Sequence, residues 1–312
     1  MKYAIISDIH GNSFALEAVI KDAREQAAEA YIFLGDYCSA LPWSNQVVDM
    51  IRSLENKTVI CGNGEGYFSD LKDQDQATWI HKQLMPMYWT YRSLTEENLF
   101  WLLSLPQSAT ITDGTRRIHM SHSSDIFINR IRLRPFRSSS YGQMMRTSPF
   151  SHEEYLAIGR KAVLEYRELK NAILDLPTEI YLNGHNHLQF YMEYAGRTFI
   201  NPGSCGASVD FSPAASYTIL NLQGGHKEIL ERRVDYDVDA VSEKLMQSDY
   251  ASKVPVWAEI ARRQLLEAEE YTAQLLWHLR DVCQSMGVSA EMPVSNEVWD
   301  EAMKTWDIND LH

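Results

Sequence analysis

Three short apolar runs in the first 63 residues each lead into a small polar block. The runs are 3–7, 31–34 and 57–60, and the blocks are Asp8-Ile9-His10, Gly35-Asp36 and Gly62-Asn63. Such runs are typical of buried strands. Helices are predicted between them, around 46–54 and at a series of helically spaced apolar residues: Leu16, Val19, Ile20, Ala23 and Ala27. Strands that alternate with helices form parallel βαβ units, whose ligand-binding loops share the carboxyl edge of the sheet. We therefore expect the three blocks to converge.

The later part of the chain carries turn dipeptides between β-rich runs. These dipeptides are Asp113-Gly114, Ala195-Gly196 and Gly224-Gly225. Such turns are typical of β-hairpins. The pattern predicts an α/β core with added antiparallel strands.

Two insertions and a tail are predicted to be helical. The insertions cover about 74–105, which is rich in Trp and Tyr, and about 124–176, where a capping box, Ser151-x-x-Glu154, opens a helix. After about Asp237 no strand pattern remains, and apolar residues mark one helical face: Trp257, Ile260, Leu265, Ala268, Leu275, Leu279 and Val282. We expect one domain over 1–236 and a helical C-terminal extension over 237–312, packed on it or beside it.

Composition narrows the class of protein. Hydrophobic residues make up 45% of the 312 residues, enough for a sizeable core. The net charge of −13 argues against stable binding to nucleic acid, which needs clustered Lys and Arg. The four cysteines show no zinc or redox spacing and are expected to be free thiols: Cys38, Cys61, Cys205 and Cys283. With no signal peptide or membrane-spanning run, we expect a cytoplasmic protein without membrane contact.

The polar blocks contain residue types that bind divalent transition metals. His122 and a further block, Gly184-His185-Asn186-His187, which follows a predicted strand at 179–182, bring the set to two Asp, four His and one Asn. Imidazole, carboxylate and amide oxygen suit manganese, iron, zinc or nickel better than calcium. Seven such ligands can hold two metals that share one carboxylate, and such a pair can clamp both oxygens of a phosphoryl displacement. A purely structural role is the alternative, and the placement of blocks after successive strands argues against it. The glycines before Asp36, Asn63 and His185 are expected to let the backbone turn sharply and bring each side chain onto a shared metal.

These motifs resemble the calcineurin-like metallophosphoesterases, and within them the small bacterial and archaeal phosphodiesterases of the YfcE type. The resemblance also includes Asn201-Pro202-Gly203-Ser204 and Ala215-Ser216-Tyr217, and it runs from Met1 to about Val234. It implies an α/β fold, a four-layer α/β/β/α sandwich, with a dinuclear metal site between the sheets.

The resemblance also implies roles for single residues. The first metal would be held by Asp8, His10 and His187, the second by Asn63, His122 and His185, with Asp36 bridging both. The residues implied as catalytic are Asp36, Asn63 and His10. A hydroxide bridging the metals would attack the phosphorus of a small phosphoester, while the metals stabilise the equatorial oxygens. Manganese is the expected metal, with iron, zinc or nickel as alternatives.

One position departs from the family pattern. Many members carry a His directly after the Gly-Asn pair, where it protonates the leaving group, but this chain has Gly64 followed by Glu65. General acid catalysis contributes about 10²- to 10⁴-fold. We therefore expect a phosphodiesterase that prefers leaving groups needing no proton. Glu65 is interpreted as structural, with proton donation through a water as the alternative. The alternatives are a phosphomonoesterase or protein phosphatase, and a non-catalytic module on the same fold, as in the retromer subunit. The complete ligand set favours an enzyme.

An Arg-rich stretch is a candidate clamp for an anionic substrate. Its members are Arg130, Arg132, Arg134, Arg137 and Arg146. Arg binds phosphate through a bidentate fork, but a solvated loop is the alternative, because charge runs alone are a weak signal. The aromatic residues of 79–101 are interpreted as core of a helical hairpin rather than as a platform for a base. A homo-oligomer is left open.

Overall fold

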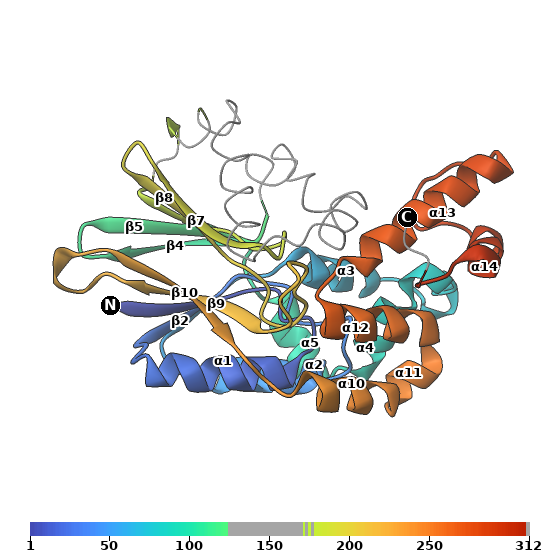
Figure 1. The fold of residues 1–312 in the computed structure, drawn as a ribbon, viewed down its shortest axis with the longest axis horizontal. Helices are drawn as coiled ribbons and strands as arrows, with labels where there is room; N and C mark the ends of the chain where they lie inside the picture. The colour runs from blue at the N-terminus through green and yellow to red at the C-terminus, as the bar shows by residue number, and fades with distance from the viewer. Residues whose placement is uncertain (124–170, 172–173, 176–177, 310–312) are drawn as a thin grey trace.

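The structure, a computed structural model, describes residues 1–123, 171, 174–175 and 178–309. Two five-stranded sheets pack face to face, and helices cover the outer face of the first (Figure 1). The strand orders are β10-β9-β1-β2-β3 and β4-β5-β6-β8-β7. Both sheets mix parallel and antiparallel pairs. This architecture confirms the expected α/β sandwich with a helical C-terminal extension.

The first sheet contains the three predicted parallel strands. They are β1 (Lys2–Ile6), β2 (Ala30–Phe33) and β3 (Lys57–Val59), joined through α1 (Ser13–Glu25) and α2 (Ser44–Ser53). Helix α1 begins where Asn12 accepts a hydrogen bond from the backbone N–H of Ala15, which satisfies one of the free donors of the first turn. Two antiparallel strands, β9 (Ala215–Asn221) and β10 (Glu228–Val234), complete the sheet.

The second sheet is built largely from hairpins. Its strands are β4 (Ser108–Asp113), β5 (Arg116–Ser121), β6 (Ile180–Leu182), β7 (Gln189–Tyr194) and β8 (Arg197–Pro202). The β4–β5 and β7–β8 hairpins turn at two of the predicted dipeptides, and the third lies in the 3₁₀ turn η4 (Gln223–Gly225) between β9 and β10. All three predicted hairpins are therefore confirmed.

The alternation of side chains in β1 places the core on both faces of the first sheet. Ala4 and Ile6 pack toward the helices, whereas Tyr3 and Ile5 pack between the sheets, where Met120 of β5 joins them. Because both faces are buried, the register of β1 is fixed, and with it the position of the loop that follows.

The predicted helical insertion at 74–105 is divided into short pieces. After α3 (Asn63–Leu71) come η1 (Gln76–Thr78), η2 (Lys82–Leu84), α4 (Met85–Ser93) and α5 (Glu96–Leu103). Trp79 stacks on Tyr88 with ring centroids 5.3 Å apart, and both side chains are buried. This packing fits the interpretation of the aromatic residues as core.

The C-terminal extension is helical, as predicted, and its described residues, 237–309, form five helices. They are α10 (Val238–Met246), α11 (Asp249–Lys253), α12 (Pro255–Glu267), α13 (Tyr271–Met286) and α14 (Asn296–Thr305). Ala268 ends α12 in a left-handed conformation, with φ 52°. The predicted single apolar face is thereby split: Leu265 packs with Leu41 of the sandwich, and Leu275 packs toward α14.

The extension is attached to the sandwich by polar contacts as well. The Asn296 side chain donates to the carbonyl of Ile80 and accepts from the backbone N–H of Lys82. Figure 1 shows these helices, coloured orange to red, at the end of the sandwich opposite the N-terminus. How the chain divides into domains stays a prediction, and the capping box Ser151-x-x-Glu154 lies outside the described residues. Among the described helices, none is long and apolar enough to cross a membrane.

Candidate metal centre

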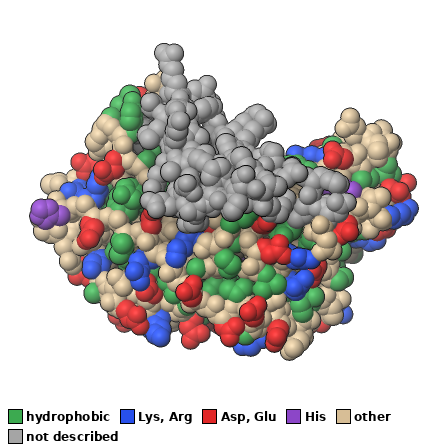
Figure 2. Space-filling model, viewed as in Figure 1, with side chains coloured by type: hydrophobic (Ala, Val, Ile, Leu, Met, Phe, Trp, Pro, Cys, Tyr) green, Lys and Arg blue, Asp and Glu red, His purple; other side chains and the backbone are tan. Residues whose placement is uncertain are grey.

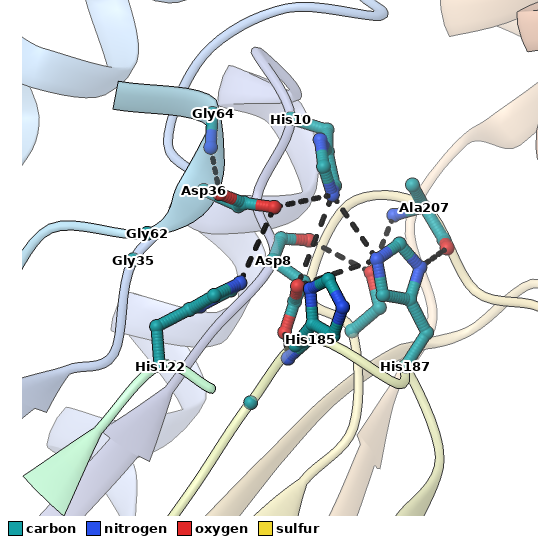
Figure 3. A network of polar contacts seen from close by, with 12 residues as sticks. Asp8, His10, Gly35, Asp36, Gly62, Gly64, His122, His185, His187 and Ala207 are labelled. Carbon is teal, nitrogen blue, oxygen red and sulfur yellow. Dashed lines mark hydrogen bonds and ion pairs between the residues drawn. The ribbon is translucent and has the colours of Figure 1, made fainter. Parts of the chain in front are cut away.

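The seven predicted ligands lie in loops at one end of the two sheets. Four of them follow strands of the first sheet or begin α3, and three come from loops of the second sheet. Six fall into two groups, in each of which the ligand atoms lie within 4.8 Å of one another: Asp8, His10 and His187, and Asp36, His122 and His185. The seventh, Asn63, has its Oδ1 atom 3.1 Å from His122 Nε2. Figure 3 shows the six side chains pointing toward one another.

Asp36 belongs to the second group and also faces the first. Its Oδ1 atom accepts a hydrogen bond of 2.7 Å from the backbone N–H of Gly64. Its Oδ2 atom is 3.9 Å from His10 Nε2 in one group and 3.4 Å from His122 Nε2 in the other. One carboxylate oxygen is thus fixed by the backbone, and the other faces ligands of both groups. This is the placement that a bridging carboxylate requires.

Asp8 provides a direct test of whether a cation fits. The carboxylate is completely buried, and Oδ2 accepts a hydrogen bond from the backbone N–H of His185. Oδ1 has no hydrogen-bond partner among the described residues, and it lies 3.3 Å from His187 Nε2. Leaving a buried carboxylate oxygen unpaired is costly. A metal held by Asp8, His10 and His187 would satisfy it, so the residues fit a cation.

Backbone carbonyls orient two of the imidazoles. His122 Nδ1 lies 2.7 Å from the carbonyl oxygen of Leu34, and His187 Nδ1 lies 2.6 Å from that of Ala207. A proton on each Nδ1 donates to that carbonyl and leaves the lone pair of Nε2 directed into the site. Metal-binding histidines usually have such an outer partner, which fixes the tautomer.

Five ligands themselves make the sharp turns of these loops. Asp8, His10, Asp36, His185 and His187 all have positive φ, between 52° and 70°. This conformation is uncommon for residues other than glycine, and clusters of such strain occur at functional sites.

The glycines that directly precede three of the ligands mainly avoid steric clashes with neighbouring atoms. From the sequence we expected each of them to make the turn, but of Gly35, Gly62 and Gly184 only Gly35 has a positive φ, of 105°. A Cβ on Gly62 would lie 2.2 Å from Asp36 Oδ1, and one on Gly184 would lie 2.1 Å from the hydroxyl of a neighbouring serine. The expectation was therefore wrong for two of the three.

Glu65 ties the loops around Asp36 together. Its Oε2 atom accepts hydrogen bonds from the backbone N–H groups of Asp36 and Gly62, at 3.0 and 2.8 Å, and Oε1 accepts one from Tyr37 at 2.9 Å. Burial and the nearby charge of Asp36 raise the pKa of Glu65 to about 7. These contacts fit the structural role that the sequence suggested.

Both ligand carboxylates stay ionised at neutral pH. Burial by itself would raise the pKa of Asp8 and Asp36, but the neighbouring imidazoles outweigh burial and hold both pKa values well below the usual range. Conversely, burial would lower the pKa of His122, but Asp36 and Asp8 raise it to about 10. A metal would have to displace that proton, as metal binding to histidine generally does.

A cavity of about 240 Å³ opens beside the two groups. One side is lined by ligands from both groups, including Asp36, His185 and His187, and the other by side chains of α12 and α13. The sequence did not predict this second wall, because apolar residues at helical spacing are read as core whether they line a pocket or fill an interior.

The predicted anion clamp lies outside the described residues. This applies to Arg130, Arg132, Arg134 and Arg137, whose role stays a prediction. Figure 2 shows acidic and basic side chains interspersed over the described part of one face, without a continuous basic patch there.

Comparison with known proteins places this site in a family. A protein of Methanocaldococcus jannaschii, described as uncharacterised, is 24% identical over 255 residues, which are 81% of this chain and 94% of that protein. A metallophosphoesterase from Sphaerobacter thermophilus has a similar structure, with a TM-score of 0.59 and 22% identity over 86% of this chain and 99% of that chain. A hypothetical protein from Pyrococcus horikoshii aligns with a TM-score of 0.57 and 17% identity over 83% of this chain and 97% of that chain.

These structural likenesses show the fold. The family itself is shown by a sequence model described as the calcineurin-like phosphoesterase superfamily domain, which matches residues 1–225. That range contains both ligand groups and both sheets except for β10. The chain therefore belongs to the calcineurin-like phosphoesterase superfamily.

Proposed function

We propose that this chain is a phosphodiesterase that uses two divalent transition metal ions, and we expect both to be manganese. The observation that carries the proposal is the position of Asp36, whose Oδ2 atom faces imidazoles of both ligand groups. A non-catalytic module would not need two complete groups around one shared carboxylate.

In this proposal each group holds one metal. Asp8, His10 and His187 bind the first, while His122, His185 and Asn63 bind the second. When bound, such a pair supplies Lewis-acid activation of the phosphoryl group and of the attacking water. The chain contributes the geometry, because backbone carbonyls hold two imidazoles and Gly64 holds Asp36. Little reorganisation is then needed when charge develops on the phosphoryl oxygens.

Gly64 favours esters with good leaving groups. A Cβ added there would lie 3.0 Å from Asp36 Oδ1, which is tighter than nine in ten real Cβ contacts. The loop is therefore packed for glycine at the position where other family members carry a proton donor. Substrates whose leaving group departs without a proton, such as an aryloxide, should be hydrolysed fastest.

Metal titration with a substrate pair tests the proposal. Protein stripped with a chelator should bind about two Mn²⁺ ions per chain. It should then hydrolyse bis-p-nitrophenyl phosphate faster than p-nitrophenyl phosphate. Asp36→Asn should lower kcat at least about 10²-fold, because the bridging charge is lost from both metals. Asp70→Asn, an exposed change on α3, is the matched control.

Each contrary outcome has a separate meaning. Two bound metals without hydrolysis of either ester would support the non-catalytic module. The absence of metal binding would contradict the assignment of the ligands. Faster hydrolysis of the monoester would contradict the diester preference while leaving the metal centre intact.

A further inference from the structure

The cavity beside the metal centre has a second wall that lies outside the superfamily match. The match ends at residue 225, whereas this wall comes from α12 and α13. Its main members are Ala261, Gln264, Leu265, Thr272, Ala273 and Leu276. The C-terminal extension therefore takes part in shaping the site.

This wall is fixed to the metal loops. The Gln264 side chain donates to the carbonyl oxygen of Ala207 at 3.0 Å, the same oxygen that lies 2.6 Å from His187 Nδ1. The carbonyl of Ala268 accepts a hydrogen bond of 3.0 Å from the backbone N–H of Phe211. Leu265 is buried in a core shared with Leu41 of the sandwich. The distance between wall and metal centre is thus set by the folded structure.

The described lining of the cavity favours an apolar group over a second anion. Its C-terminal wall presents mostly alanine and leucine side chains, and the described lining contains no Lys or Arg. The lining does contain the carboxyl groups of Asp36 and Glu270. Among these described residues a phosphate would find no Lys or Arg side chain to bind it. An apolar group would instead be removed from water, which is favourable by about 25 cal/mol per Å².

The volume indicates the size of the group. A cavity of about 150 Å³ can hold a benzene molecule. A cavity of about 240 Å³ accommodates one ring together with part of the phosphoryl group. Because the candidate metal ligands line the same cavity, an ester arm attached to the reacting phosphorus can extend into it.

We propose that α12 and α13 form a specificity pocket for one ester arm of the substrate, and that this arm is an uncharged, ring-sized apolar group rather than a phosphorylated one. The inference rests on the proposed function, because it requires the phosphoryl group to lie at the metal centre. Leu276 and Ala273 then determine specificity, since both line the pocket without belonging to either ligand group.

Binding of phosphonates to the manganese-loaded protein tests the pocket without turnover. Phenylphosphonate and methylphosphonate share the phosphonate group, so the ratio of their affinities measures the contribution of the phenyl ring relative to the methyl group. Calorimetry should show the phenyl compound binding about tenfold more tightly, equivalent to about 1.4 kcal/mol. A 4-carboxyphenylphosphonate, which adds a charge to the same ring, should bind at least tenfold more weakly than phenylphosphonate.

Two variants change the pocket in different ways. Leu276→Gln makes the wall polar, and Ala273→Leu fills the space while keeping it apolar. Both should reduce the phenyl-to-methyl ratio to near one while leaving methylphosphonate binding unchanged. Gln274→Leu, on α13 but outside the lining, is the matched control and should keep the ratio. Thermal unfolding of each variant checks that the extension stays folded.

The outcomes separate this inference from the proposed function. Equal binding of phenyl- and methylphosphonate by the wild type would overturn the pocket, as would tight binding of the carboxylated ring. Retention of the ratio in both folded variants would overturn the roles of Leu276 and Ala273. A protein that shows the ratio but hydrolyses no ester would refute the phosphodiesterase alone. A protein that hydrolyses bis-p-nitrophenyl phosphate without showing the ratio would refute the pocket alone.

Discussion

Replacing Glu65 with glutamine should weaken the metal centre through the backbone that supports Asp36. The carboxylate accepts three backbone hydrogen bonds, from Asp36, Tyr37 and Gly62. Glutamine has one acceptor oxygen, so at least one buried N–H loses its partner and faces the NH₂ group of the new side chain. Each unsatisfied buried group costs about 1–3 kcal/mol. The backbone N–H that loses its acceptor and the glutamine NH₂ group that faces it are two such groups, so the loss of folding stability is about 2–5 kcal/mol.

An opposing effect acts in the metal-free protein. Burial and Asp36 raise the pKa of Glu65 from 4.5 to about 7, so the ionised form is disfavoured in the folded state. The difference corresponds to about 3 kcal/mol, and an uncharged glutamine avoids it. At pH 8 the two effects nearly cancel, and we expect the metal-free variant to lie within about 2 kcal/mol of the wild type.

Bound metals should remove that cancellation. Divalent cations oppose the field of Asp36, so an ionised Glu65 is no longer disfavoured and the lost hydrogen bonds dominate. The free energy of unfolding of the variant should then fall short of wild type by about 2–5 kcal/mol. By linkage, the same difference appears as weaker metal binding, about tenfold for each 1.4 kcal/mol.

The pH dependence has a definite sign. Because the pKa of Glu65 is raised on folding, the folded wild type binds extra protons between pH 4.5 and about 7 and loses stability as the pH rises through that interval. The variant lacks this group, so its metal-free deficit should be larger at pH 5 than at pH 8.

Urea unfolding with chelator and with saturating Mn²⁺, at both pH values, measures all these quantities. Glu17→Gln, an exposed change on α1, is the control for loss of one charge. An equal deficit with and without metal would refute the argument that Asp36 opposes Glu65, and no deficit under any condition would refute the role of the three hydrogen bonds.

Three further changes have expected outcomes. Gly64→His should lower kcat for bis-p-nitrophenyl phosphate, because a Cβ there would lie 3.0 Å from Asp36 Oδ1; an unchanged or higher kcat for this substrate would contradict the steric argument. Gln264→Leu should weaken Mn²⁺ binding in calorimetry by less than the tenfold or more typical of a direct partner, since it supports His187 only through the carbonyl of Ala207. Removal of the metals by a chelator should lower the midpoint of thermal unfolding, because the buried carboxylates then lack their cations.

The sequence was sufficient to locate one half of the candidate metal centre. Asp8, Asp36 and Asn63 follow apolar runs that had to be parallel strands, and the carboxyl ends of parallel strands share an edge. The approach of His122 and His185 from the second sheet could not be derived in that way. It depends on how two sheets pack face to face, which no local pattern encodes, and it came from the family resemblance.

Backbone conformation was harder to predict. We expected glycine to make each turn, but five of the ligands, His10 and His187 among them, themselves have positive φ. Sequence propensity cannot show this, because a left-handed histidine is unfavourable unless the surrounding structure enforces it. The carbonyl oxygens of Leu34 and Ala207, which orient two imidazoles, were also missed, since any residue provides such an atom.

The separation between metal centre and pocket wall has a consequence for specificity. The ligands lie within the superfamily match, whereas α12 and α13 lie beyond it. The wall meets the metal loops through Gln264, a backbone hydrogen bond at Ala268 and apolar packing, and it supplies none of the seven candidate ligands. Side chains such as Leu276 can therefore change without altering the residues that hold the metals. In the proposed arrangement the sandwich determines the reaction, and the C-terminal helices determine which ester arm fits beside it.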